Sequence, residues 1–308
     1  MSPEQTPPAT TPRAILITGA SSGIGNALAR RFAERGWRVF ATMRAPDGPG
    51  GRALRDEAAA RGWRLTTPAL DVTRDESVAA AVGAALAETS GRLDVLVNNA
   101  GYYALGALED FTPDELRAQL ETNVVGVQRV TRAVLPAMRA RRSGTIVTLG
   151  SISGRVAVPM TGAYTASKWA LEGMIESMRL ELLPFGVRVV LIEPGPYESE
   201  LHTNEQEAAA SRRPESPYAG IMSAYRRQAK ALRRAPLQGL VDVIERAVTS
   251  RSPRLRWPVG PTSLTAGRLR AFCPDFIYEW IMRLGFPLRP SMALPPAPPP
   301  GSDPRAGR

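Results

Sequence analysis

Short apolar runs alternate along the chain with longer stretches in which apolar residues recur every three or four positions. The runs have the length and composition of buried strands, whereas the longer stretches have the periodicity of amphipathic helices. Strands are predicted at residues 13–18, 38–43, 63–70, 93–97, 145–149, 187–192 and 254–259. Helices are predicted from the end of a glycine-rich segment to about residue 36, and at 53–61, 77–88, 113–141, 164–183 and 237–250. This alternation predicts an α/β fold with a single doubly wound parallel sheet and helices on both faces.

The two ends of the chain differ in composition from this alternating part. Residues 1–12 contain four prolines and no apolar core, so we expect a disordered segment that is neither a signal peptide nor a membrane span. Residues 287–308 are proline-rich and are also expected to be disordered. The folded domain is therefore expected to span residues 13–286.

Two segments near the C-terminal end do not continue the alternation. Residues 200–236 are polar, rich in arginine and interrupted by Pro214 and Pro217. Because they follow the sixth strand, we expect them to form a mobile substrate lid; an insertion without a role is the alternative. Residues 275–285 form an aromatic-rich helical segment that could pack on the domain, cover the active site or touch a membrane surface. Packing is favoured, because so short a helix is a weak membrane anchor.

A glycine-rich segment lies between the first strand and the first helix. This order builds a pyrophosphate site, because glycines let the backbone approach the ligand and the helix N-terminus offers free N–H groups. We therefore predict a dinucleotide site and a Rossmann fold; the alternative is a tight turn of the kind found in any α/β protein. The candidate cofactor contacts in this segment are Gly19, Ser21, Ser22, Gly23, Ile24 and Gly25.

The end of the second strand distinguishes between two cofactors. A carboxylate there would bind the free 2′-hydroxyl of the adenosine ribose and indicate NAD. This chain has Met43 followed by Arg44, and the nearest acid, Asp47, lies beyond a proline. An arginine suits a phosphate, so NADP(H) is predicted as the cofactor and NAD(H) is less favoured. The alternative is that Arg44 points to solvent and the site accepts both.

Polar residues follow the third and fourth strands. Asp71 and Val72 end the third strand, and Asp71 is predicted to bond the adenine amino group, although it could instead cap the helix at 77–88. Asn98 to Gly101 follow the fourth strand, where side-chain amides can tie neighbouring strands together. Asn123 lies inside a predicted helix, an unfavourable place for asparagine, so it is either exposed or bonded to something specific.

Tyr164 and Lys168 form the candidate catalytic pair. They are four residues apart and lie on one face of the predicted helix at 164–183. We expect the lysine to favour the phenolate and to lower the pKa of Tyr164 towards the working range. An ordinary helix-surface pair is the alternative. Only Lys168 and Lys230 are lysines in a chain otherwise rich in arginine, and a guanidinium cannot replace a compact ammonium in this task.

Composition narrows the classes of partner. The chain carries 39 basic and 29 acidic residues, a net charge of +10, but the basic residues are spread without interleaved aromatics, so no nucleic-acid partner is predicted. The single cysteine, Cys273, excludes an intrachain disulfide and fits a reducing compartment. The lone His202 cannot form a His-rich metal site, and no metal is predicted. No apolar stretch is long enough for a transmembrane helix, and a cytoplasmic location is expected.

Taken together, these motifs resemble the short-chain dehydrogenase/reductase family. The resemblance covers residues 12–192 and extends with less similarity to residue 250. Within the family, residues 41–44 and 171–186 resemble the hydroxysteroid and retinol dehydrogenase branch. The motifs that carry the family resemblance are Thr18-Gly19-x-x-x-Gly23-x-Gly25, Asn98-Asn99-Ala100-Gly101, Asn123, Ser151, Tyr164-x-x-x-Lys168 and Pro194-Gly195.

The resemblance implies a role for each matching residue. Tyr164 would be the acid/base, Lys168 would hold the nicotinamide ribose, Ser151 would bond the substrate oxygen, and Asn123 would position a water that links Lys168 to solvent. Ser199 stands where the family has a threonine that contacts the nicotinamide amide. Further cofactor contacts are implied at Asn98, Ala100, Gly101, Pro194 and Gly195.

The resemblance thus implies an oxidoreductase that interconverts a carbonyl and an alcohol. A hydrophobic substrate is expected from the candidate pocket residues Tyr102, Tyr103, Val156, Met160 and Tyr197. The main alternative is a catalytically idle NADP-binding regulator on the same scaffold. Loss of a catalytic residue would support it, but this chain keeps all four, which are Asn123, Ser151, Tyr164 and Lys168. A methyltransferase is disfavoured, because it gives the Tyr164–Lys168 pair no task.

A homodimer or homotetramer is also expected. Two predicted helices carry apolar stripes beyond what the catalytic face requires, and such helices side by side resemble the surface through which family members pair. The stripe residues are Leu171, Met174, Ile175, Met178 and Leu182 on one helix, and Leu116, Leu120, Val124, Val127 and Val134 on the other.

Overall fold

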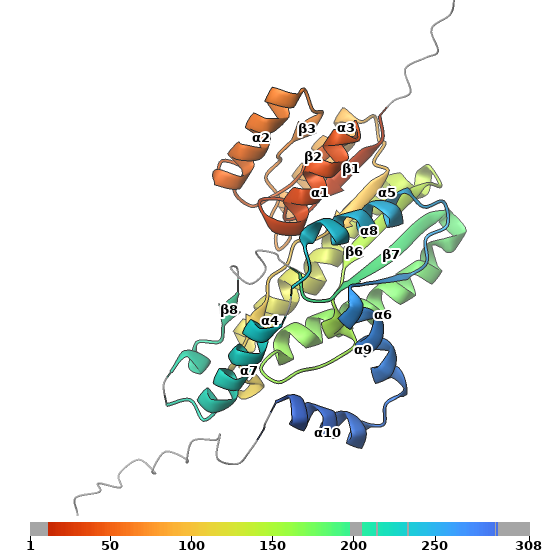
Figure 1. The fold of residues 1–308 in the computed structure, drawn as a ribbon. Coiled ribbons are helices and arrows are strands. Elements are labelled where there is room, and N and C mark those ends of the chain that lie inside the picture. The colour runs from red at the N-terminus through yellow and green to blue at the C-terminus, as the bar shows by residue number, and fades with distance from the viewer. Residues whose placement is uncertain (1–11, 198–204, 214, 233, 287, 289–308) are drawn as a thin grey trace, which may run out of the picture.

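The computed structural model describes residues 12–197, 205–213, 215–232, 234–286 and 288. Within these ranges, seven parallel strands form one sheet in the order β3-β2-β1-β4-β6-β7-β9 (Figure 1). The chain builds the sheet outward from β1 in one direction and from β4 in the other, so the order reverses between these two strands. The strands are β1 (Ala14–Ile17), β2 (Arg38–Ala41), β3 (Leu65–Thr66), β4 (Val95–Asn98), β6 (Gly144–Leu149), β7 (Val187–Pro194) and β9 (Arg256–Val259). The predicted doubly wound parallel sheet is confirmed.

Helices cover both faces of this sheet. One face carries α1 (Gly23–Glu34), α2 (Pro49–Arg61) and α8 (Leu237–Thr249), and the other carries α3 (Asp75–Glu88), α5 (Gly126–Ala140) and α6 (Gly162–Leu182). The strands dictate this layering, because successive side chains point to opposite faces. In β1, Ile15 and Ile17 pack in the first layer, whereas Ala14 and Leu16 pack in the second.

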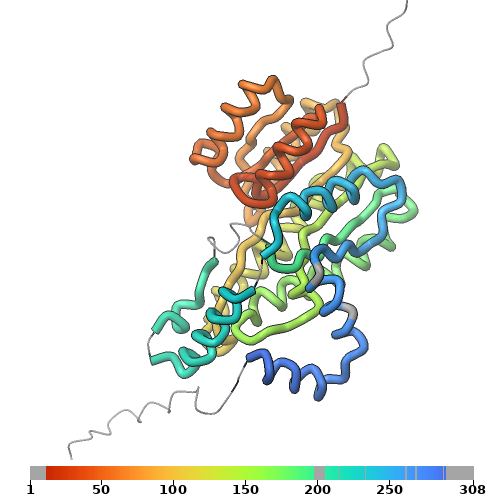
Figure 2. The backbone as a smooth tube through the Cα atoms, viewed as in Figure 1, coloured from red at the N-terminus to blue at the C-terminus, as the bar shows by residue number. Residues whose placement is uncertain are grey.

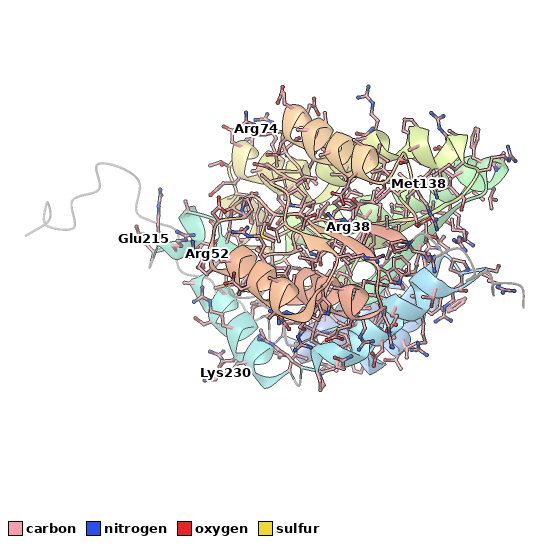
Figure 3. The ribbon with its side chains drawn as sticks, turned by 90° about the horizontal axis from the view of Figure 1, so that it is seen from above. Arg38, Arg52, Arg74, Met138, Glu215 and Lys230 are labelled. Carbon is pink, nitrogen blue, oxygen red and sulfur yellow. The ribbon has the colours of Figure 1, made fainter. Side chains whose placement is uncertain are left out.

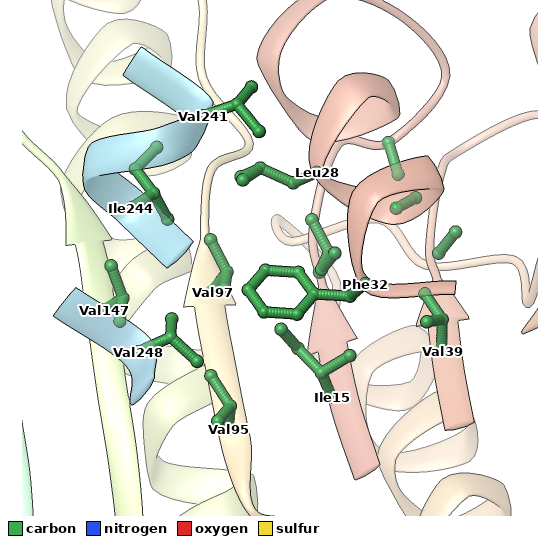
Figure 4. Close-up of a cluster of buried hydrophobic side chains, with 14 of the residues drawn as sticks. Ile15, Leu28, Phe32, Val39, Val95, Val97, Val147, Val241, Ile244 and Val248 are labelled. Carbon is green, nitrogen blue, oxygen red and sulfur yellow. The ribbon is translucent and has the colours of Figure 1, made fainter. Parts of the chain in front are cut away.

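The core between α1, α8 and the sheet is fully apolar. Figure 4 shows Phe32 of α1 beside Ile15 and Val97, and Ile244 of α8 beside Val147. Each of these side chains is fully buried. Burial of such a side chain contributes roughly 1.5–3 kcal/mol. This layer holds the start of α1, and with it the glycine segment, against the edge of the sheet.

The predicted helix at 113–141 is interrupted at Asn123. It consists of α4 (Pro113–Leu120), a π-helical turn (Glu121–Val125) and α5. α4 begins with a capping box, in which Thr112 and Glu115 satisfy each other's backbone N–H groups. The wider turn buries the Asn123 side chain, so the expectation that this residue bonds something specific is the correct one of the two.

The segment expected to be a lid contains regular structure. β5 (Ala104–Leu105) pairs with β8 (Gln206–Glu207) in a separate parallel ladder, and α7 (Ala219–Ala231) follows. The predictions for 1–11, 198–204 and 289–308 lie outside the described residues. Short 3-10 turns occur at Leu108–Asp110, Ile152–Gly154, Leu183–Phe185 and Ala210–Arg212.

Two helices after β9 complete the described chain. α9 (Pro261–Phe272) was not predicted, whereas α10 (Asp275–Gly285) matches the predicted aromatic helix. Both lie at the end of the molecule that also carries α7 (Figures 1 and 2). None of the described helices combines the length and apolar character that crossing a bilayer requires.

Several predicted boundaries shift. The expected third strand is reduced to Leu65–Thr66 and a single bridge between Met43 and Ala69, because the chain diverges from β2 between them. The helix predicted at 53–61 begins earlier, with Pro49 at its first position, where proline is well tolerated. Basic side chains are dispersed over the surface: Figure 3 shows Arg38, Arg52, Arg74 and Lys230 apart from one another.

Candidate functional site

A cleft of about 1120 Å³ lies at the carboxyl ends of the central strands. Ligands bind at this position in open α/β sheets, where the strand order reverses. The cleft brings together most of the residues predicted for the site: Gly19, Ser21, Ser22, Gly23, Ile24, Arg44, Asp71, Val72, Ala100, Gly101, Ser151, Tyr164, Lys168, Pro194 and Gly195. Gly25, Asn98 and Asn123 do not line the cleft, and Ser199 is outside the described residues.

The glycine segment is packed so tightly that side chains are excluded. Gly19 and Gly23 have positive φ angles of 67° and 54°. A Cβ at Gly19 would lie 2.8 Å from the Cα of Ala100, and a Cβ at Gly25 would lie 2.5 Å from the Gly19 carbonyl oxygen. Gly25 therefore supports the turn from behind. The residue before α1, Ser22, makes no capping bond, so the N–H groups of the first helical turn remain available to an anion.

Asn98 and Asn99, at the end of β4, bond to different parts of the structure. The Asn99 amide donates to the carbonyl oxygens of Thr18 (2.8 Å) and Gly19 (3.0 Å). Asn98 donates to the Thr131 hydroxyl at 3.0 Å and is buried behind the cleft. The predicted tying of neighbouring strands is confirmed for Asn99, whereas Asn98 is a supporting residue without access to the cleft.

Asn123 fixes the backbone of Tyr102. Its side-chain oxygen accepts from the Tyr102 N–H, and its amide donates to the Tyr102 carbonyl and to the Ser167 hydroxyl, each bond being 3.1 Å long. The π-helical turn directs this side chain inward, between α6 and the segment around Tyr102 that follows β4. The water-positioning role implied for Asn123 stays a prediction.

Tyr164 and Lys168 lie in the first two turns of α6, and their side chains are almost fully buried. The Lys168 ammonium donates to the Leu149 carbonyl at 2.7 Å and lies 5.5 Å from the centre of the Tyr164 ring. Burial lowers the pKa of Lys168 to about 8. At the end of β6, the Ser151 hydroxyl accepts from the Ser153 N–H at 3.1 Å and is hydrogen-bonded to Tyr164.

The predicted lowering of the Tyr164 pKa is wrong for the protein alone. Burial raises the pKa of Tyr164 to about 12, and the hydrogen bond with Ser151 offsets only part of this rise. The physical reason is that burial removes the water that would stabilise a phenolate, while the Lys168 ammonium is bonded to a backbone carbonyl. Tyr164 is therefore a protonated phenol at neutral pH.

The other end of the cleft contains Arg44 and Asp71. Arg44 is exposed, whereas Met43 is buried with the core. The Asp71 carboxylate accepts from the Thr73 N–H (2.9 Å) and hydroxyl (2.7 Å). Burial opposes the ionisation of Asp71, but the Thr73 bonds and the nearby charge of Arg44 lower its pKa on balance. The carboxylate thus closes its own turn and does not cap α3, and its predicted bond to adenine is untested.

Asp47, the nearest acid after the second strand, points away from the ribose position. Its carboxylate is bonded to Arg55 at 3.1 Å and its side chain is 90% exposed. The strand end therefore provides a cation to the cleft but no carboxylate at the position typical of NAD enzymes.

Sequence reasoning missed several residues that line the cleft. Arg30 of α1 donates to Asn26 at 3.0 Å and pairs with Glu57. Gly50 packs so closely that a Cβ there would lie 2.0 Å from the Ser21 carbonyl oxygen. Asn26 and Arg30 are four residues apart, like many polar pairs on a helix surface, so the sequence alone does not distinguish them from residues without a role in the cleft.

Aromatic and apolar residues from distant segments cover Tyr164. Tyr103 packs edge-on against Tyr164, with ring centres 4.4 Å apart, and its hydroxyl is 2.6 Å from the hydroxyl of Tyr225 on α7. Met160 and Met222 belong to the same cluster. Among the predicted pocket residues, Tyr102 and Tyr197 line the cleft, whereas Val156 belongs neither to the cleft nor to this cluster.

A buried pair of carboxylates joins α6 to the end of β7. Glu193 directly precedes Pro194, and Glu172 is one turn beyond Lys168. Arg155 lies 3.6 Å from both carboxylates, and Arg256 lies 2.8 Å from Glu172. Burial, together with the neighbouring Glu172, raises the pKa of Glu193 from 4.5 to about 7. Within the described ranges, no group of histidine, cysteine or acidic side chains is arranged to hold a metal ion.

This raised pKa predicts a pH-dependent stability. The unfolded chain loses the Glu193 proton near its ordinary pKa of 4.5, but the folded chain keeps it until about 7. The folded state therefore binds more protons in this window, and the free energy of unfolding should fall as the pH rises through it. Glu193→Gln, which stays neutral, should lose this slope in urea denaturation. Identical slopes in both proteins would contradict the assignment.

The chain matches the family model described as short chain dehydrogenase over residues 13–210. It is 34% identical over 284 residues to a 3-ketodihydrosphingosine reductase of Bacteroides thetaiotaomicron, covering 90% of this chain and 99% of that protein. It is 46% identical over 187 residues to human 17-beta-hydroxysteroid dehydrogenase type 1, covering 59% of this chain and 56% of that protein.

Solved structures with a similar fold also include short-chain dehydrogenases. A short-chain dehydrogenase from Streptomyces avermitilis superposes with a TM-score of 0.77 at 32% identity, covering 89% of this chain and 98% of that one. A metagenomic short-chain oxidoreductase in complex with NADP gives a TM-score of 0.65 at 31% identity, covering 81% and 97%. With the motifs gathered in one cleft and the match spanning most of the domain, the chain belongs to the short-chain dehydrogenase/reductase family of oxidoreductases.

Proposed function

We propose that this protein is an NADP(H)-dependent oxidoreductase that reduces the carbonyl group of a hydrophobic substrate, with Tyr164 as the acid/base. One observation carries the proposal: Ser151, Tyr164 and Lys168 line the same cleft as the glycine segment. The solved relative that binds NADP, at 31% identity, supports the choice of cofactor.

The residues of the cleft fit a dinucleotide phosphate. The glycine segment leaves no room for side chains, and the first turn of α1 is uncapped, so this end would hold the pyrophosphate. Arg44 would bind the 2′-phosphate, and Lys168 would bind the nicotinamide ribose. When bound, NADPH supplies the hydride that reduces a carbonyl carbon.

The chain's own residues would supply the proton and the orientation. The Ser151 hydroxyl would donate to the substrate oxygen, and the Tyr164 hydroxyl would transfer its proton to that oxygen as negative charge develops there. A phenol whose pKa is raised to about 12 is protonated at neutral pH, which favours the donor role and hence reduction. Alcohol oxidation would require the phenolate, whose formation burial opposes.

The surroundings of Tyr164 favour an apolar substrate. Tyr103, Met160 and Met222 cluster around it, and Tyr197 lines the cleft. The relatives are named for a ketosphingoid and a steroid, and human retinol dehydrogenase 8 is 42% identical over 198 residues, covering 62% of this chain and 61% of that protein. A ketone on a long-chain or polycyclic lipid is the proposed substrate class.

A panel of ketones and alcohols tests the function. Loss of the reduced-nicotinamide absorbance is expected with NADPH and apolar ketones, and with polar ketones it should be slower. An idle regulator would bind NADPH, measured by fluorescence titration, without turning over any member of the panel. That outcome would favour the idle NADP-binding regulator and contradict the proposed enzymatic function.

We also propose a homodimer or homotetramer. The predicted stripe residues Leu171 and Ile175 are buried in the subunit's own core, so they cannot form the interface. Large apolar residues that stay exposed nearby include Val125, Trp169 and Leu180, at 40%, 48% and 65%. Light scattering should give a multiple of the chain mass, and Leu180→Glu should shift it towards one chain. A strictly monomeric mass at micromolar concentration would contradict this.

A further inference from the structure

The face of α10 turned away from the domain is apolar. Phe276, Trp280 and Leu284 are 73%, 61% and 65% exposed, and Ile277 and Ile281 are 37% and 44% exposed. Their four-residue spacing places these five side chains on one face of the helix. Where α9 meets α10, Leu269 and Phe272 are also exposed, at 70% and 89%. We call these seven residues the α10 face.

The helix is held to the domain by its other side. The Tyr278 hydroxyl donates to the Ala157 carbonyl, and the Arg270 guanidinium lies 4.4 Å from the centre of the Tyr278 ring. Directly after the helix, Phe286 stacks on Tyr225 with ring centres 6.5 Å apart. The orientation of α10 is therefore fixed, while none of the residues that the structure describes covers its apolar face. The predicted packing of α10 on the domain is therefore correct only for the side of the helix that carries Tyr278.

A continuous aromatic path joins α10 to the catalytic tyrosine. Phe286 stacks on Tyr225, the Tyr225 hydroxyl bonds that of Tyr103, and the Tyr103 ring packs on Tyr164. All four belong to or pack against one apolar cluster. These contacts link the end of α10, through one packed cluster, to the ring of Tyr164.

We propose that the α10 face rests on the surface of an anionic lipid bilayer, and that the apolar substrate enters the protein from that bilayer. The entry route rests on the proposed function, whereas the docking does not. An exposed apolar face of this kind marks an interaction site, and a helix with Trp, Phe and Leu on one face is suited to the headgroup boundary. Its eleven residues are few for an anchor, but the exposed Leu269 and Phe272 add to the apolar surface at this end of the molecule.

Charge and size favour a bilayer over a second copy of the chain. The net charge of +10 attracts anionic lipid. A stable protein interface needs roughly 20–30 residues from each partner, and the α10 face has seven. Insertion into a bilayer needs no such partner area, because each apolar side chain contributes separately.

Flotation of the full chain with vesicles tests the proposal. Vesicles of phosphatidylcholine with one part in three phosphatidylserine should carry the protein to the top of the gradient, and pure phosphatidylcholine should carry much less. Leu284→Ser should weaken binding to the anionic vesicles by about tenfold or more. The matched control is Leu183→Ser, since Leu183 is 60% exposed at the end of α6, and it should bind normally.

Three outcomes would overturn the docking. These are no flotation with anionic vesicles, equal binding of both variants, or a Leu284→Ser variant whose only change is a smaller mass by light scattering, which would identify a second copy as the occupant. For the entry route, Leu284→Ser should slow reduction of a vesicle-embedded ketone while leaving a water-soluble ketone unaffected. If the protein reduces no ketone, the proposed function fails, and flotation still decides the docking.

Discussion

Tyr164→Phe is expected to lower turnover of an established substrate by ~100- to 10,000-fold, the usual contribution of general acid catalysis. The substitution removes only the hydroxyl that would protonate the substrate oxygen. The ring stays in its buried position against Tyr103, so the fold and the cleft should not change. NADPH affinity, measured by fluorescence titration, should stay near that of the unmodified protein.

Tyr103→Phe is the matched control for this experiment. It removes a second buried hydroxyl from the same cluster, one that bonds Tyr225 on α7, but leaves the proposed proton donor intact. Its effect on turnover should be far smaller than that of Tyr164→Phe. Near-normal turnover in the Tyr164 variant, or equal losses in both variants, would remove Tyr164 from the acid/base role.

Arg44→Ala is expected to weaken NADPH binding by on the order of 10- to 100-fold while barely changing NADH binding. A charge-assisted hydrogen bond contributes roughly 1.5–3 kcal/mol, and tenfold in affinity corresponds to about 1.4 kcal/mol. Arg44 is exposed at the rim of the cleft, so its removal leaves no cavity. Arg52→Ala is the matched control, because Arg52 is bonded to the Asp47 backbone outside the cleft.

Met43→Asp should reverse the preference. A carboxylate there would accept from the free 2′-hydroxyl of NADH and repel the added phosphate of NADPH. Because Met43 is only 2% exposed, thermal denaturation must accompany the titrations to show that the variant stays folded. If the unmodified protein binds NADH as tightly as NADPH, the argument from Met43 and Arg44 fails, while the family assignment is unaffected.

The central strands and their helices could be predicted because their signals are local. Ile15 and Val95 lie in short apolar runs that can only be buried strands, and the α1 and α6 motifs depend on spacing alone. β5 and β8 are two-residue strands that exist only because distant segments meet. The π-helical turn at Asn123 likewise depends on Tyr102 and Ser167, which lie on other elements.

The electrostatics of the site could not be predicted for the same reason. The pKa of Tyr164 depends on its burial, and much of that burial comes from Tyr103, Met222 and Tyr225, which lie far from it in the chain. The sequence shows that Lys168 is one turn away from Tyr164, but it does not show that the ammonium bonds the Leu149 carbonyl. Spacing identified the groups, and tertiary packing sets their protonation.

The close contact of Gly50 with Ser21 limits how this enzyme can be engineered or diversified. A Cβ at Gly50 would lie 2.0 Å from the Ser21 carbonyl oxygen, and one at Gly51 would lie 2.0 Å from the Pro46 carbonyl oxygen. The start of α2 is thus packed directly against the glycine segment and the loop that follows β2, and a side chain at either glycine would push these segments apart. Libraries that vary the proposed choice of cofactor should therefore change positions 43 and 44 and keep both glycines.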